Sequence, residues 1–299
     1  MKEVVVAASR YATSHATTEV DVVRPDGTVV ELLFKDLAPA GLLAEAVGHR
    51  PPFLDDPRRE VEVYGAVLPG AGLGTARCLA AGEAEGEPWL LLERVPGTVL
   101  WQVGEIDAWC DVARWAARLQ TAALDVTGAP RLLHYDRSYF ERWPDRVRHH
   151  LGSGDGAARR QLDRVLARYA EVVDALVALP TRFVHGELYA SNVVVDSASS
   201  RVCAVDWEMA GVGPAELDLA ALVAGDWDES QRSSLLGAYH GALPPERRRT
   251  LADLRTDVTR CRLHLCLQWL GWSQGWEPPV GHGQDWLGTA VECTEELGL

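Results

Sequence analysis

Basic residues are scarce in this chain of 299 residues. Lysine and arginine together number 29, against 43 aspartates and glutamates, and the formal net charge is −14 at pH 7. Nucleic acids and anionic membranes attract proteins through a basic face. The charge balance therefore argues against either partner. It suits a cationic or neutral small ligand, although part of the charge serves solubility.

Paired cysteines and long apolar runs are also missing. The six cysteines are irregularly spaced and form no CxxC pair, which indicates a reduced, cytoplasmic protein. The amino-terminal segment MKEVVVAASRYATS has too short an apolar run for a signal peptide. No stretch approaches about 18 uninterrupted apolar residues, so the sequence predicts no transmembrane helix. Its length allows two domains or one large two-lobed domain.

The first part of the chain is typical of strands. Alternation and β-branched residues mark residues 18–23 and 28–35, with Pro25-Asp26-Gly27 as the turn between them. A helix follows at 58–68, and a further strand pair covers 76–80 and 89–93. We place the lobe boundary at the Pro96-Gly97 break, which divides the chain into an amino-terminal lobe, 1–95, and a carboxy-terminal lobe, 96–299.

Beyond this boundary the pattern becomes helical. Asp107 is a candidate cap for a helix that continues to Leu124. Apolar residues at helical spacing between Leu162 and Leu176 predict a second, amphipathic helix. The fold class predicted from these patterns is α+β, with a small antiparallel β lobe and a large, mainly helical lobe.

The segment FVHGELYASNVVV places polar residues between two apolar strands. Asn192 precedes a strand at 193–195, and Asp206 follows a strand at 202–205. A hairpin formed by these strands would bring Asn192 and Asp206 together. An amide oxygen beside a carboxylate is a hard ligand pair suited to Mg²⁺. The sequence therefore predicts a magnesium site at Asn192 and Asp206.

Two other charged residues complete a set for phosphoryl transfer. Glu187 lies in the same loop, where it could face a substrate hydroxyl as a base. Lys35 ends the apolar strand ELLFK and could balance the charge of a nucleotide phosphate, held by Glu60 or Glu62 on the following helix. Glu60 is the weakly preferred partner. A base, two metal ligands and a phosphate-binding lysine on two lobes are the parts that phosphoryl transfer needs.

These motifs resemble the signature of the aminoglycoside phosphotransferase-type kinases, whose bilobal fold is protein-kinase-like. The family pattern His-Gly-Asp-x4-Asn, then Asp-Trp, then Asp-Leu-Ala, corresponds here to HGELYASN, VDW and DLA. The resemblance covers residues from about 10 to 225. It implies Glu187 as catalytic base, Asn192 and Asp206 as metal ligands and Lys35 as phosphate lysine. It also implies ATP, with GTP as an open alternative, and Mg²⁺ as cofactors.

The resemblance assigns further positions and shows three departures. Glu93 and Val95 lie in the connector, whose backbone would bind adenine. The family's catalytic Asp is Glu187 here, Gln120 stands where the family often has His, and the loop YATSHATT between the first strands contains no glycine. The first and third departures bear on catalysis rather than on the fold. They motivate an alternative function, a kinase-like nucleotide-binding or ligand-binding module with little or no turnover.

Several other polar residues have structural interpretations. We expect His185 and Asp218 to fix the backbone of the catalytic loop. Cys261, His264 and Cys266 are better explained by core packing than by zinc, because further ligands are lacking.

The carboxy-terminal tryptophans allow two interpretations. Trp269, Trp272 and Trp276 either pack in the core or line an acceptor pocket with flat apolar walls. The expected function is transfer of a γ-phosphoryl group to a hydroxyl of a small molecule of the antibiotic or natural-product type. A protein kinase is disfavoured, because only 11 residues separate Asp206 from Asp218. The sequence does not indicate the oligomeric state.

Overall fold

Two compact units make up the protein. The computed structural model describes residues 3–9, 14–42, 50–150, 156–272 and 284–299. The first unit comprises Met1–Val103, Ala123–Leu132 and Ser191–Ala210, and the second comprises Gly104–Ala122, Leu133–Ala190 and Gly211–Leu299. The hairpin region 191–210 therefore groups with the amino-terminal strands, whereas a division at residue 95 assigns it to the other lobe.

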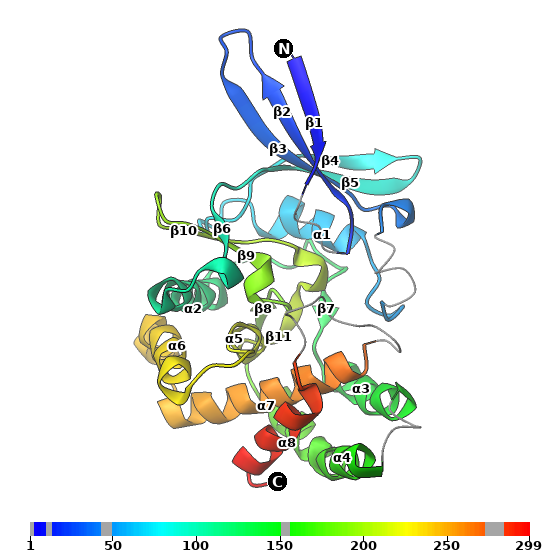
Figure 1. Ribbon diagram of the computed structural model, residues 1–299, viewed down its shortest axis with the longest axis vertical. Helices are drawn as coiled ribbons and strands as arrows, with labels where there is room; N and C mark the ends of the chain where they lie inside the picture. Colours follow the sequence, from blue (N-terminus) through cyan, green and yellow to red (C-terminus); the bar gives the residue numbers. More distant parts are fainter. Residues whose placement is uncertain (1–2, 10–13, 43–49, 151–155, 273–283) are drawn as a thin grey trace. The chain divides into compact units, whose positions relative to one another are not determined.

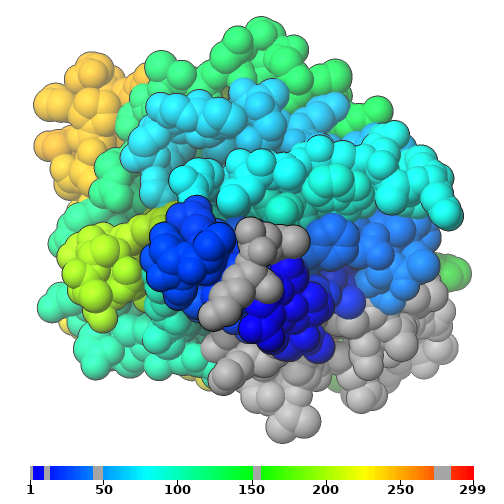
Figure 2. Space-filling model, turned by 90° about the horizontal axis from the view of Figure 1, so that it is seen from above, coloured from blue at the N-terminus to red at the C-terminus, as the bar shows by residue number. Residues whose placement is uncertain are grey.

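A five-stranded antiparallel sheet forms most of the first unit (Figure 1). Its order is β1-β2-β3-β5-β4, with β1 at Glu3–Ala8, β2 at Thr17–Val23, β3 at Val29–Asp36, β4 at Cys78–Ala84 and β5 at Glu87–Glu93. Seen from above, the cyan residues of β4 and β5 form a band beside the blue amino-terminal strands (Figure 2). The sheet confirms the predicted strands to within a few residues, and it adds β1.

The β2–β3 turn is the predicted Pro25-Asp26-Gly27. Gly27 has a φ of +86°, a left-handed conformation that costs glycine little. The Asp26 carboxylate accepts hydrogen bonds from both the N–H and the hydroxyl of Thr28, which is the usual way for Asp to close a turn. Strand β1 was missed because its residues EVVVAA are all exposed and show no alternation.

The first unit also contains a short helix and a small second sheet. Helix α1, Arg58–Glu62, continues as a π-helical turn over Val63–Val67, so the predicted helix at 58–68 is confirmed in extent but is not wholly α-helical. Strands β9, Val193–Asp196, and β10, Arg201–Ala204, form the predicted hairpin, and β6, Thr98–Val99, pairs with β9.

Helices dominate the second unit. They are α2 (Ile106–Thr121), α3 (Arg137–His150), α4 (Gly156–Val177), α5 (Glu216–Leu222), α6 (Glu229–Ala242), α7 (Leu251–Leu270) and α8 (Trp286–Glu296). A three-stranded sheet of β7 (Leu133–His134), β11 (Gly211–Pro214) and β8 (Thr181–Val184) completes the unit. Helix α7 packs against α3, α5 and α8, so its buried face forms the centre of the helical core.

The predicted helical stripes face this core. Every apolar member of the stripe from Leu162 to Leu176 in α4 is buried. Helix α2 starts at Ile106, so Asp107 lies in its first turn and is not its cap, and the helix ends at Thr121 rather than Leu124. Among the described residues, no helix is both long and apolar enough to cross a membrane.

Cys261, His264 and Cys266 lie in the core, as expected. All three are buried, and the Nδ1 atom of His264 lies 2.8 Å from the hydroxyl of Tyr169. Burial lowers the pKa of His264 to about 3, so the ring is neutral at physiological pH. The hydrogen bond to Tyr169 explains how α7 carries an imidazole in an apolar environment.

Candidate active site

Strand β3 and helix α1 hold a buried ion pair in the first unit. The side chain of Lys35 lies 2.7 Å, Nζ to Oε2, from Glu60, and the two residues are 4% and 1% exposed. Glu62 instead lies 3.0 Å from the guanidinium of Arg131 and accepts its backbone N–H. Between the two glutamates, Glu60 is therefore the partner of Lys35.

The β9–β10 hairpin brings Asn192 and Asp206 together. The N–H of Val205 donates to the carbonyl of Asn192 over 2.9 Å, which continues the hairpin register by one residue. Asp206 follows directly and has a φ of +65°, a left-handed conformation that Asp adopts more readily than most residues. This turn aims its carboxylate at Lys35, with Nζ 2.7 Å from Oδ1.

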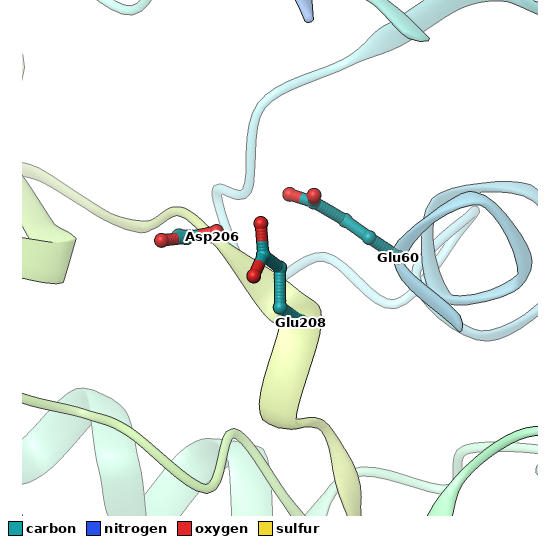
Figure 3. A group of neighbouring side chains, drawn as sticks. All are labelled: Glu60, Asp206 and Glu208. Atoms are coloured by element: carbon teal, nitrogen blue, oxygen red, sulfur yellow. The ribbon is translucent and has the colours of Figure 1, made fainter. Parts of the chain in front are cut away.

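A third carboxylate, missed by the sequence reasoning, completes the cluster. Glu208 lies on the 3₁₀ turn Trp207–Met209, and its Oε1 is 3.1 Å from the Nζ of Lys35. Figure 3 shows Glu60, Asp206 and Glu208 gathered around one small space. The segment VDWEM contained a signal, because a second acidic residue stands two positions after Asp206. The sequence does not show, however, that the turn between them directs both carboxylates toward Lys35.

Glu208 also binds the glycine-free loop. The Nδ1 of His15 lies 3.1 Å from Oε1 of Glu208, and Arg50 donates to Oε2. His15 belongs to the YATSHATT segment, residues 11–18, of which residues 11–13 lie outside the described residues. A buried imidazole thus occupies part of the loop in which the resemblance led us to look for glycines.

Burial and charge act against each other in this cluster. Burial opposes the charge of Lys35, but the carboxylates of Asp206, Glu60 and Glu208 outweigh it and raise its pKa well above the ordinary value. Burial, together with the charges of Asp206 and Glu208, raises the pKa of Glu60 to about 7. For Glu208, Lys35, Arg50 and His15 outweigh burial and hold the pKa well below its usual range. One cation therefore stabilises several carboxylates.

The donor set suits a hard divalent cation. Oxygen atoms of Glu60, Asp206 and Glu208 all lie within 4.8 Å of one another, and Asn192 is 7% exposed. Carboxylate and amide oxygens are the ligands that Mg²⁺ takes in proteins. The residues present therefore fit a magnesium ion. The ammonium group of Lys35 contacts the same three carboxylates.

The second unit holds the HGE loop by its backbone. The N–H groups of His185 and Gly186 donate to the Asp218 carboxylate over 2.9 and 2.8 Å. The side chain of Gln120 donates to the same carboxylate over 3.2 Å. Gln120, which stands where the family often has His, is thus a hydrogen-bond partner of the Asp218 carboxylate that holds the loop. Burial raises the pKa of Asp218 to about 7, although these three donors oppose that rise.

Glu187 follows this anchored dipeptide. Its N–H donates to Nδ1 of His185 over 3.3 Å, so the His185 ring, which is fully buried, helps to fix the position of the glutamate. Glu187 itself is half-buried. Burial, with a contribution from the charge of Glu187, raises the pKa values of Tyr139 and Tyr189. Two neutral tyrosines therefore stand near the carboxylate.

Aromatic rings continue from the loop into the helical core. The indole N–H of Trp269 donates to the hydroxyl of Tyr189 over 2.6 Å. Trp269 stacks on Trp286, and Trp272 stacks on Trp143, with ring centroids 5.8 and 6.2 Å apart. The rings of Trp269 and Trp272 are both partly exposed, so neither is a purely internal core residue. Trp276, the third tryptophan named from the sequence, lies outside the described residues.

The predicted adenine connector is partly engaged in the sheet. The N–H of Glu93 donates to the carbonyl of Arg77 over 2.8 Å, and its carboxylate pairs with Arg201 at 2.7 Å. Adenine recognition by Glu93 would therefore fall to its carbonyl. Val95 lies two residues on, beyond the end of β5.

Comparison with known proteins identifies the family. Residues 35–252 match the phosphotransferase enzyme family. The chain belongs to this family. The match includes every residue of the Lys35 cluster except His15, together with the whole HGE loop. No sequence among the curated proteins matches the chain.

Solved structures show the same fold at low sequence identity. The GDP complex of wild-type aminoglycoside 2′-phosphotransferase-IIIa is 16% identical, with a TM-score of 0.63 over 98% of this phosphotransferase and 91% of that chain. The ethanolamine kinase of Plasmodium vivax is 11% identical, with a TM-score of 0.62 over 99% and 82%. Macrolide 2′-phosphotransferase MphH from Brachybacterium faecium is 15% identical, with a TM-score of 0.57 over 96% and 90%. These likenesses confirm the protein-kinase-like fold.

Proposed function

We propose that this phosphotransferase moves the γ-phosphoryl group of ATP or GTP to a hydroxyl group of a small molecule. The observation that carries the proposal is the position of Lys35. Its ammonium group lies 2.7 Å from both Glu60 and Asp206. A buried lysine that a helix glutamate holds beside a metal-binding aspartate is the arrangement that nucleotide phosphates require in kinases.

The roles of the first unit follow from charge. Lys35, oriented by Glu60, would contact nucleotide phosphate oxygens. Asn192 and Asp206 would hold Mg²⁺, which neutralises charge on the phosphates when it is bound. Glu208 supplies a third carboxylate to the same space, and it is held there by His15 and Arg50. A phosphate entering this space would replace carboxylate oxygens as partners of Lys35.

Glu187 would accept the proton from the acceptor. The acceptor oxygen forms a bond to the γ-phosphorus, the bond from that phosphorus to the β–γ bridging oxygen breaks, and the nucleoside diphosphate leaves with the electron pair. The hydroxyl proton passes to the Glu187 carboxylate. Asp218 and Gln120 act through the loop backbone, and the aromatic residues Tyr189, Trp269 and Trp272 would contact the acceptor.

The acceptor is expected to be a compound of the antibiotic or natural-product type. The solved relatives act, by their names, on aminoglycosides, macrolides and ethanolamine, which are small alcohols of different sizes. The aromatic surface around Trp269 is suited to a ligand with an extended apolar or sugar face. A screen of hydroxylated natural products would identify the individual acceptor.

A radioactive transfer assay tests the proposal. The protein with Mg²⁺ and γ-labelled ATP or GTP should label at least one acceptor from a panel of hydroxylated natural products, and Asp206→Ala should abolish the labelling. A matched Glu62→Gln variant should retain it, because Glu62 pairs with Arg131 outside the cluster. Nucleotide binding without transfer to any acceptor, in wild type, would favour the binding-module alternative, for which Glu187 and the glycine-free loop are the motivation.

A further inference from the structure

A cavity of about 560 Å³ opens among the helices of the second unit. It is lined by α5, α6, α7 and α8 and by the segment between α5 and α6. Two arginines, Arg232 of α6 and Arg262 of α7, contribute to the wall. None of the site residues discussed so far requires these arginines, and the chain is otherwise strongly acidic.

These arginines make few polar contacts within the described residues. Nε of Arg232 and the indole nitrogen of Trp227 are buried and have no hydrogen-bond partner there. Arg232 makes one long contact, 3.4 Å, to the Trp227 carbonyl. Arg262 forms a long ion pair, 3.9 Å, with Glu296. Arg232 and Arg262 line the same cavity, and burial, followed by the charge of Arg262, lowers the pKa of Arg232.

Buried donors without partners are costly. An N–H removed from water without an acceptor costs about 1–3 kcal/mol, and two neighbouring cations repel each other. An anion placed between them would satisfy both. Guanidinium groups present planar pairs of N–H donors that match carboxylate and phosphate oxygens. The wall of the cavity is therefore built for one compact anionic group.

The mouth of the cavity has the opposite charge. Asp226, Asp285 and Glu292 line it and are exposed. One oxygen of the Asp285 carboxylate, Oδ1, accepts a hydrogen bond from the N–H of Gly288 and caps α8. Exposed carboxylates repel a second anionic group and accept hydrogen bonds from hydroxyls or amines. A polyanion is disfavoured by this rim.

Aromatic contacts connect the cavity to the catalytic loop. Trp286 lines the cavity and stacks on Trp269, whose indole donates to the hydroxyl of Tyr189. Tyr189 is two residues beyond Glu187. A ligand that lies along these rings would have one end at the loop and the other at the arginines.

We propose that Arg232 and Arg262 bind a single carboxylate or phosphate group carried by the hydroxylated acceptor. This inference rests on the proposed function, because the bound compound is an acceptor only if the catalytic loop transfers a phosphoryl group to its hydroxyl. The arginines select against purely polycationic amino sugars, and the rim carboxylates select against polyanions. The acceptor class is a small hydroxylated compound with one anionic group.

Equilibrium binding without nucleotide tests the arginine site separately from catalysis. Ribose 5-phosphate serves as the probe, and ribose is its matched control without the anion. Calorimetric titration should detect ribose 5-phosphate only. Arg232→Gln and Arg262→Gln should each weaken its binding about tenfold or more, which is the loss expected for a charged hydrogen-bonded contact. Arg255→Gln on the same helix α7 should change it less than twofold, because Arg255 pairs with Glu229 and does not line the cavity.

A variant that is expected to gain affinity distinguishes an effect on the anion site from misfolding. Glu292→Gln removes one rim charge and should tighten probe binding severalfold, an effect that a destabilised protein would not mimic. Equal affinities in wild type and both glutamine variants of the cavity arginines would overturn the inference, even if phosphoryl transfer to another acceptor is found. Arginine-dependent binding in a protein that transfers no phosphoryl group would leave the anion site standing and refute the proposed function.

Discussion

Lys35 and Asp206 lie 2.7 Å apart, Nζ to Oδ1, although 171 residues separate them in the chain. The contact joins a strand of the main sheet to the turn after the β9–β10 hairpin within one compact unit. Lys35 contacts Glu60 and Glu208 as well. It is therefore the cation around which the three carboxylates are assembled.

Lys35→Met should destabilise the protein, and the loss should grow with pH. The ammonium group lowers the pKa values of Glu60 and Glu208, so without it burial should raise both above their unfolded value of about 4. Their contribution is then favourable only below about pH 4 and is lost as pH rises through the raised folded values. We expect a loss of about 3–5 kcal/mol near pH 8 and a smaller one at pH 5. Urea unfolding against Lys2→Met measures it, and a loss independent of pH would contradict the cluster electrostatics.

Asp206→Asn should remove the magnesium-dependent part of nucleotide binding. At a hundredfold excess over its dissociation constant, a ligand stabilises the folded protein by about 2.7 kcal/mol. Wild type should show this shift with magnesium and nucleotide, and EDTA should remove it. Glu62→Gln serves as the matched control. An unchanged magnesium-dependent shift in Asp206→Asn would show that the metal lies elsewhere.

Glu187→Ala should lower kcat by a factor of about 10²–10⁴, the usual contribution of a general base, and leave nucleotide affinity nearly unchanged. Glu187→Asp should also be slower than wild type. The missing methylene withdraws the carboxylate by about 1.5 Å, and a misplacement of about 1 Å can cost on the order of a hundredfold. Single-turnover kinetics separate these effects from binding. If wild type is inactive and Glu187→Asp is active, the site is that of a decayed kinase.

Asp218→Asn should flatten the dependence of stability on pH. Burial raises the folded pKa of Asp218 to about 7, above its unfolded value of about 3.9. A raised folded pKa contributes stability below the unfolded pKa that is lost as pH rises through about 7. Wild type should thus lose stability between about pH 4 and pH 7. The variant should lose less, with Glu60 accounting for part of the remaining slope. Parallel curves would refute the assignment.

Trp272→Ala should raise the acceptor KM more than the nucleotide KM. Trp272 stacks on Trp143 and belongs to the aromatic surface that includes Trp269. Removal of its ring should reduce the contact between the protein and the acceptor and leave the contact with the nucleotide unchanged. Trp101→Ala is the matched control, since Trp101 is 50% exposed and belongs to the first unit. Equal changes in both KM values would place the acceptor away from these rings.

Local patterns predicted those parts of the site that adjacent residues determine. The hairpin of Asn192 and Asp206 follows from two short strands and a turn, and both lie where the spacing indicated. The sequence indicated only a preference for Glu60 over Glu62. The two side chains leave the helix on different faces, and only the packing of the helix decides which face meets Lys35. Glu208 was missed because the direction of its side chain depends on the left-handed backbone conformation at Asp206, which the residue pattern does not predict.

Long-range contacts explain the other differences. Gln120 was recognised as a departure from the family pattern, but its hydrogen bond to Asp218 depends on two helices meeting. The grouping of residues 191–210 with the amino-terminal strands depends on β6 pairing with β9. Arg232 and Arg262 lie 30 residues apart on separate helices. Neither carries a motif, and only the tertiary fold brings them to one cavity.

Lysine occurs at only two positions in the whole chain, Lys2 and Lys35. The carboxylate cluster keeps the Lys35 amine buried and protonated, so it is a poor nucleophile toward amine-selective acylating reagents. The amino terminus and Lys2 are then the only competing amines. A single added acyl mass on the peptide that contains Lys35 would therefore report directly, by mass spectrometry, each condition that separates this lysine from its acids.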